Sequence, residues 1–286
     1  MLLGAFFFST GGVTIKAVGL DGFRLAGLRA GAAVLAILVI LPAARSLGTW
    51  RTWMVGLAYA VTALLFVHAN QSTTAANSTF LQATSPIYIL LMGPLLLKER
   101  LVPKDLAYLA VIALGMVLFF LGSEPALRTA PRPFFGNLLA AISGLTWALT
   151  IVGMRWLGRG TAAGGPTSGR GTAASAALCG NVILFGAMLP WILSGPAPKP
   201  LDWLLLAYLG TFQIGFAYLF ITGAVGRLSA LEASLLLILE PVLNPLWAYL
   251  IHGEVSSAWA QAGGLLILGA TASKALGDLP WRRMRP

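Results

Sequence analysis

Long apolar stretches alternate along the whole chain with short breaks that contain charged residues, proline or glycine. A helix that spans a membrane needs about 20 predominantly apolar residues. The pattern therefore predicts an all-α membrane protein with ten transmembrane helices. We expect these helices over residues 2–18, 25–41, 52–72, 75–97, 105–122, 135–157, 173–193, 203–224, 229–251 and 256–276.

The third break is polar but carries no formal charge at neutral pH, since it runs from His68 to Thr74 through alanine, asparagine, glutamine, serine and threonine. Such a stretch suits a tight turn between two antiparallel helices. The alternative is one broken helix through this region. That arrangement would leave nine spans and place the two ends of the chain on opposite sides of the membrane.

The chain contains an internal repeat, because residues 69–99 align without gaps on residues 224–254. The alignment pairs Pro86 with Pro241, and a glutamate follows each proline after the same spacing. Proline and glutamate are scarce in membrane helices, so their shared spacing is more informative than the many leucine and alanine matches.

The repeat predicts two halves of opposite orientation in the membrane. Five helices is an odd number, so the second half begins on the side where the first half ends. We expect a first five-helix repeat over 1–122, a connecting loop over 123–134, a second five-helix repeat over 135–276 and a basic tail over 277–286. Such inverted repeats are typical of secondary transporters, in which two similar halves exchange conformations and open a site to each side in turn.

The composition excludes an ordinary soluble domain, because only 10% of the residues are charged while 58% are hydrophobic. A soluble domain carries about 25% charged residues. The net charge of +10 would favour nucleic-acid binding in a soluble protein. Here, however, the basic residues lie at the ends of apolar segments, so we expect no nucleic-acid partner.

The basic residues also predict the orientation of the chain, since cytoplasmic loops are rich in lysine and arginine. With the start of the first helix in the cytoplasm, thirteen basic residues fall on the cytoplasmic side and four on the other. The thirteen are Arg45, Arg51, Lys98, Arg100, Lys104, Arg155, Arg159, Arg170, Arg227, Lys274, Arg282, Arg283 and Arg285, and the four are Arg24, Arg128, Arg132 and Lys199. We therefore expect a multi-pass protein of the bacterial inner membrane with both termini in the cytoplasm.

Few residues are suited to enzyme chemistry. The two histidines are 184 residues apart, the only cysteine is Cys179, and no phosphate loop with its lysine is present. We expect no metal, no cofactor and no ATP-driven pump, so transport would run on gradients. A channel or lipid scramblase without coupled transport is the alternative, and a membrane-embedded enzyme is a further one. The expected partners are a small-molecule substrate and the lipid bilayer, with the chain acting as a monomer or a homodimer.

Glu240 is the sharpest candidate for a site residue, because it lies within the helix expected over 229–251 and directly precedes Pro241. An acid at the centre of a membrane helix costs about 2.5–3.5 kcal/mol on insertion scales. It could carry protons or bind a substrate ammonium group. The alternative is a neutral or paired glutamate that holds two helices together.

Other polar or helix-breaking residues of the spans are further candidates. Pro86 and Pro241 are expected to act as hinges near the site, since each removes a helix hydrogen bond. Ser85 and Tyr88 flank Pro86, and Asn244 follows Glu240 by one turn on the same face.

Four more residues complete the candidate substrate-binding set. His68 and Gln71 lie together at the outer end of the third helix, where an interfacial turn is the alternative. Trp147 could stack on a substrate or pack against lipid. Arg29 could bind a carboxylate, extend to the outer interface or pair with Asp21.

The two repeated segments resemble those of a known family. In the first, Ala75-Ala76-Asn77-Ser78 precedes Pro86 and the segment ends in Leu97-Lys98-Glu99-Arg100; in the second, Leu231-Glu232-Ala233-Ser234 precedes Glu240-Pro241-Val242 and the segment ends in Gly253-Glu254. Over essentially the whole chain, the sequence is similar to EamA-type carriers of the drug/metabolite transporter superfamily. The basic residue Arg29 fits this pattern, whereas Phe8-Ser9 departs from the Trp-Gly of many members.

The resemblance implies a carrier with ten helices around a central cavity. It implies export or uptake of metabolites such as amino acids, with the fifth and tenth helices outside the cavity. We therefore expect a secondary transporter, working as an exporter of small polar metabolites by alternating access.

Overall fold

A computed structural model describes residues 2–92, 103–121, 126–159, 168–225 and 238–277. These residues are almost entirely helical, and no strand is present in the described ranges. The helices are α1 (Leu2–Ser9), α2 (Gly11–Ala17), α3 (Gly22–Ile40), α4 (Trp50–Ser72), α5 (Ala75–Gln82), α6 (Ser85–Met92), α7 (Pro103–Leu121), α8 (Pro133–Arg159), α9 (Ser168–Ser194), α10 (Pro200–Tyr208), α11 (Ala217–Val225), α13 (Leu239–His252) and α14 (Ala258–Gly277), with a short 3₁₀ turn η1 (Pro42–Arg45) and a π-helical segment η3 (Leu209–Phe216).

Five helical segments are long and apolar enough to cross a membrane. They are Gly22–Ile40, Trp50–Ser72, Pro133–Leu157, Ala173–Ser194 and Pro200–Ile221, and shorter apolar helical segments cover Leu2–Ala17 and Asp105–Leu121. Large apolar side chains such as Leu35, Val39, Leu193 and Leu265 are exposed on the outside of the bundle. In water that surface would be unfavourable, whereas in a bilayer it faces lipid. The chain is therefore a multi-pass membrane protein.

Local capping decides where several helices begin. The Asp21 side chain accepts a hydrogen bond from Arg24 N (3.1 Å), so α3 begins three residues before the expected range. In the same way, Thr74 Oγ1 accepts from Asn77 N (3.2 Å) at the start of α5. At the other end of α13, Gly253 has φ +66°, a left-handed conformation that commonly ends a helix.

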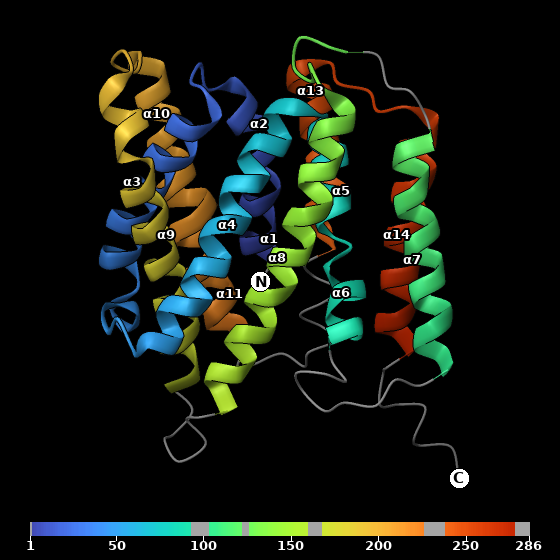
Figure 1. Cartoon of the computed structure of the whole chain (residues 1–286), viewed down its shortest axis with the longest axis horizontal. Coiled ribbons are helices and arrows are strands. Elements are labelled where there is room, and N and C mark those ends of the chain that lie inside the picture. The colour runs from blue at the N-terminus through green and yellow to red at the C-terminus, as the bar shows by residue number, and fades with distance from the viewer. Residues whose placement is uncertain (1, 93–102, 122–125, 160–167, 226–237, 278–286) are drawn as a thin grey trace.

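The non-helical segment after the third predicted helix is much shorter than the polar stretch from His68 to Thr74. His68 and the residues up to Ser72 form the last turn of α4, and only Thr73 and Thr74 lie between α4 and α5. Figure 1 shows the chain turning back at this point, with α4 rising and α5 and α6 descending. The turn between two helices is confirmed here, and the single broken helix is wrong.

Two of the predicted helices are interrupted. The helix expected over 2–18 is divided at Thr10, where the Ser9 and Thr10 hydroxyls donate to the carbonyls of Phe6 and Phe7 and two glycines follow. Hydroxyl groups that bond to the nearby backbone compete with the regular helix ladder.

The helix expected over 75–97 is divided between Gln82 and Ser85, and Pro86 follows in the first turn of α6. Proline is tolerated in a first turn because its missing N–H would have no helical partner there. Pro241 likewise lies in the first turn of α13. The part of the expected helix over 229–237 lies outside the described residues, as does the end of the first repeated segment.

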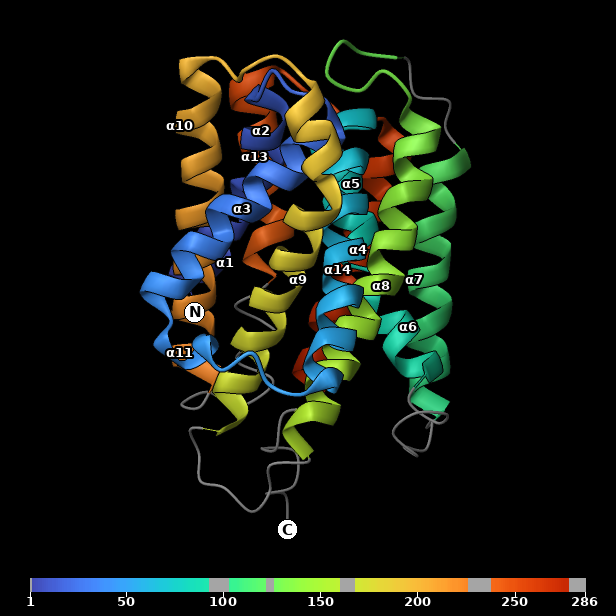
Figure 2. The same ribbon diagram turned by 60° about the vertical axis from the view of Figure 1, so that its left-hand side comes forward.

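The helices α7 and α14 lie side by side at one edge of the bundle (Figures 1 and 2). They approach closely at two glycines, because a Cβ atom on Gly263 would lie 2.6 Å from the carbonyl oxygen of Gly115. At the opposite part of the bundle, η3 packs on α3 through Gly210, whose Cβ would lie 2.4 Å from that of Ala32. Helices α1, α4, α5, α8 and α13 lie between these two contacts and, together with α3, η3 and α11, surround the middle of the bundle (Figure 1).

Candidate functional site

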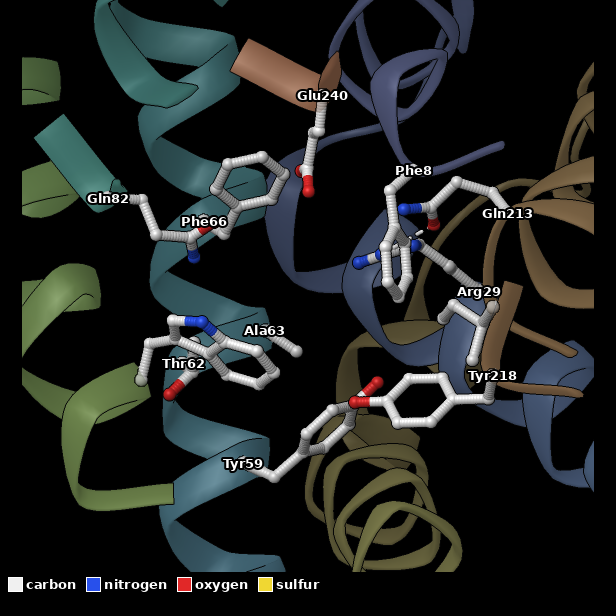
Figure 3. A pocket seen from close by; sticks show the side chains of 12 residues that line it. Phe8, Arg29, Tyr59, Thr62, Ala63, Phe66, Gln82, Gln213, Tyr218 and Glu240 are labelled. Carbon is white, nitrogen blue, oxygen red and sulfur yellow. Dashed lines mark hydrogen bonds between the residues drawn. The ribbon is translucent and has the colours of Figure 1, made fainter. Parts of the chain in front are cut away.

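A pocket lies between these central helices (Figure 3). It encloses roughly 560 Å³ of empty space, counting its open side. Its lining comes from α1, α3, α4, α5, α8, η3, α11 and α13, and no lining residue belongs to α7 or α14. The lining residues are Phe8, Arg29, Tyr59, Thr62, Ala63, Phe66, Gln82, Trp147, Gln213, Ile214, Tyr218 and Glu240.

Arg29 supplies the positive charge of the pocket. It is buried on α3, and its Nη2 donates a hydrogen bond to Gln213 Oε1 (2.7 Å). Its Nε has no partner among the described residues. Arg29 therefore neither reaches the interface nor pairs with Asp21, which caps α3 instead. A guanidinium that lines a pocket and has one unpaired donor is suited to a carboxylate.

Glu240 supplies the negative charge. It lies in the first turn of α13, and Figure 3 shows its carboxylate directed into the same space as the Arg29 guanidinium. Among the described residues, neither Arg29 nor Glu240 forms an ion pair. The pocket thus presents one acid and one base that are both available to a ligand.

Aromatic rings form much of the remaining wall. Tyr218 packs edge-on against Phe8, with ring centroids 5.8 Å apart, and against Tyr59 at 6.2 Å. Trp147 from α8 also lines the pocket. Rings of this kind offer apolar contact area together with a polar edge.

Hydrogen-bonded side chains complete the wall on the side of α4, α5 and α8. Gln82 Nε2 donates to Ser143 Oγ (2.8 Å), and Thr62 Oγ1 donates to Thr146 Oγ1 (2.9 Å). Gln82, Thr62 and Gln213 are pocket residues that were not predicted from the sequence. A glutamine within an expected span is the signal that could have found Gln82 and Gln213.

Two of the predicted site residues lie at the end of α4, away from the pocket lining. The His68 ring packs edge-on against Phe23 at 4.5 Å, and Gln71 Nε2 donates to Leu20 O (2.9 Å). These contacts tie α4 to the start of α3.

Three further predicted residues are also separate from this pocket. Ser85 is buried at the start of α6, and Tyr88 packs with a cluster that includes Leu81. Asn244 is fully buried on α13 and donates through Nδ2 to Thr79 Oγ1 (2.6 Å). Of the expected substrate-binding set, the structure therefore brings together Arg29, Trp147 and Glu240.

Apolar helices of spanning length around a pocket with charged and aromatic walls are typical of membrane transporters. The match to known proteins is specific: residues 1–121 and 134–273 match the EamA-like transporter family. The chain belongs to this family.

Relatives and a solved structure agree with this membership. An uncharacterized protein of Pseudomonas aeruginosa is 31% identical over 90% of this chain and 85% of its own length. Uncharacterized transporters of Methanothermobacter thermautotrophicus and Archaeoglobus fulgidus are 27% and 25% identical, over 72% and 94% of this chain and 58% and 92% of their own lengths. A crystal structure of a protein with 20% identity has a TM-score of 0.64 and covers 99% of this chain and 96% of its own, which shows the fold alone.

Proposed function

We propose that the protein is a secondary carrier for small zwitterionic metabolites such as amino acids. The observation that carries this proposal is that Arg29 and Glu240 line one pocket and do not form an ion pair there. An α-carboxylate would bind the guanidinium and an α-ammonium group the carboxylate. The aromatic wall would contact the substrate side chain.

We propose further that the carrier works by alternating access between two inverted five-helix repeats, 1–122 and 135–276. The self-similarity of residues 69–99 and 224–254 supports this arrangement. Proline in the first turn of both α6 and α13 supports hinges at Pro86 and Pro241, because helix starts of this kind can reorient without breaking an internal ladder. The distribution of basic residues supports an inner-membrane location with both termini in the cytoplasm.

Transport by purified protein in proteoliposomes tests the proposal. Vesicles preloaded with unlabelled amino acids would take up a labelled mixed pool faster than empty vesicles, since a carrier exchanges substrates across the membrane. The uptake should saturate. Uptake that neither saturates nor responds to preloading would indicate a channel, and movement of fluorescent lipid alone would indicate a scramblase. Everted membrane vesicles test the direction, for which we propose export.

A further inference from the structure

Two asparagines lie one helical turn beyond the pocket. Asn70 follows the pocket residue Phe66 by four positions on α4, and Asn244 follows Glu240 by four positions on α13. Residues four apart lie on the same face of a helix. Both asparagines are fully buried, with 0% of their surface exposed.

Each of these side chains uses its amide nitrogen but not its amide oxygen. Asn70 Nδ2 donates to Phe66 O (3.0 Å), and Asn244 Nδ2 donates to Thr79 Oγ1 (2.6 Å). No donor among the described residues bonds to the Oδ1 atom of Asn70 or of Asn244. A buried acceptor without a donor is costly, so a pair of them in one place calls for an explanation.

The two oxygens point to the same spot beside Gly12. A Cβ atom on this residue would lie 2.7 Å from Asn244 Oδ1, 2.9 Å from Asn244 Nδ2 and 2.9 Å from Asn70 Oδ1. Glycine is therefore required here for steric reasons. The same geometry means that a single small group beside Gly12 would touch both oxygens at once.

The charges near this spot favour a positive ligand. The carboxylate of Glu240 lies one turn away on the face of Asn244. The helix ladder continues across the break between α1 and α2, because Thr10 N donates to Phe7 O and Thr14 N donates to Thr10 O. The start of α2 therefore does not present a fully open, positive helix end.

We propose that Asn70, Asn244 and Gly12 form a binding site for a compact monovalent cation, held by the two neutral amide oxygens with the Glu240 carboxylate nearby. Carbonyl oxygens beside interrupted helices coordinate cations in several secondary transporters. The cation is either a sodium ion that accompanies the substrate or the primary ammonium group of the substrate itself. The inference rests on the proposed function for its role, but not for the existence of the site.

Thermal unfolding of the purified full-length chain in detergent tests the site. The Tm would be compared in sodium chloride, methylammonium chloride and choline chloride at equal ionic strength, since choline is too large to fit. Binding should raise the Tm by about 2–4 °C above the value in choline, in a saturable manner. A rise with sodium assigns a coupling ion, and a rise with methylammonium alone assigns the substrate ammonium group.

Two variants and a control make the test specific. Gly12→Ala places a methyl group against both oxygens and so excludes a cation between them, and Asn70→Ala removes one oxygen without adding bulk, so both should abolish the cation-dependent rise. Gly186→Ala is the control, because a Cβ atom there meets nothing within 4 Å. The proposal would be overturned by equal Tm values in all three salts, or by a rise that persists in both variants. In that case a rotated Asn244 amide would hydrogen-bond to Asn70 and explain the two oxygens.

The result is independent of the transport assay. A cation-dependent rise in a protein that transports no amino acid would refute the carrier but retain the site. Transport of amino acids without any cation-dependent rise in Tm would retain the carrier and refute the cation site.

Discussion

Lys16 and Glu254 form a buried ion pair, with Nζ 2.9 Å from Oε1 and side chains that are 1% and 2% exposed. Lys16 Nζ also donates to Thr73 O (2.7 Å) and to Thr129 O, and Glu254 Oε2 accepts from Ala75 N (2.9 Å). The pair therefore ties α2 and the segment that follows α13 to the turn between α4 and α5. Figure 1 shows α2 and the end of α13 at one end of the bundle, where these contacts join them.

The first prediction concerns this ion pair. Lys16→Met should lower the free energy of unfolding by about 3–5 kcal/mol, because it leaves the carboxylate of Glu254 buried without its partner. Adding Glu254→Gln should restore part of the loss, since the amide oxygen still accepts from Ala75 N. Thermal unfolding in detergent measures both effects. Arg132→Met, at an exposed position, is the control for loss of one positive charge. An equally stable Lys16→Met protein would contradict the buried geometry.

The second prediction concerns Arg29. Arg29→Gln should weaken the binding of zwitterionic substrates by about ten- to a hundredfold, because charge-assisted hydrogen bonds contribute about 1.5–3 kcal/mol. Competition against labelled amino acids in proteoliposomes measures the change. Arg128→Gln removes the same charge from an exposed loop and should transport like the parent. Equal losses in the two variants would point to net charge and not to the pocket.

The third prediction concerns Glu240. If its carboxylate binds the substrate ammonium group, Glu240→Gln should reduce the apparent affinity by about tenfold in both exchange and uphill transport. Assays at several pH values, with equal amounts of inserted protein, separate this effect from proton coupling. A loss restricted to pH-driven uphill transport would assign proton transfer to Glu240 instead. Unchanged transport at every pH would remove Glu240 from the site.

The fourth prediction concerns topology. Reporter fusions after Pro286 and after Ala162 should both report the cytoplasm, because the basic residues of the chain concentrate on that side. A fusion after Arg128 should report the opposite side. A periplasmic signal from the fusion at the end of the chain would contradict the ten-helix arrangement.

The fifth prediction concerns the paired helices at the edge of the bundle. Gly115→Leu should separate α7 from α14, since a Cβ atom on Gly115 already meets the carbonyl of Gly263 at 3.0 Å. We expect a lower Tm but an unchanged apparent affinity for substrate, because neither helix lines the pocket. An affinity that falls as far as in Arg29→Gln would place these helices closer to the transport site than the structure does.

The membrane character of the chain, the positions of most helices and three residues of the pocket could be predicted from the sequence. These features are local. Apolar runs specify spans because the bilayer excludes unpaired backbone groups, and Pro86 specifies a helix start because it lacks an N–H. Arg29 and Glu240 were recognisable because charged groups are rare in spans and need a wet or polar environment.

Which helix faces meet depends on the packing of the whole bundle and could not be predicted from the sequence. Tyr59, Gln213 and Tyr218 belong to residue types that serve equally well at a lipid interface or in a pocket, so their sequence positions could not distinguish the two. Asn244 shares a face with Glu240 yet lies one turn beyond the lining, beside Gly12. Helix periodicity shows which side of a helix is polar. Which other helix packs against that side depends on contacts between segments that are far apart in the chain.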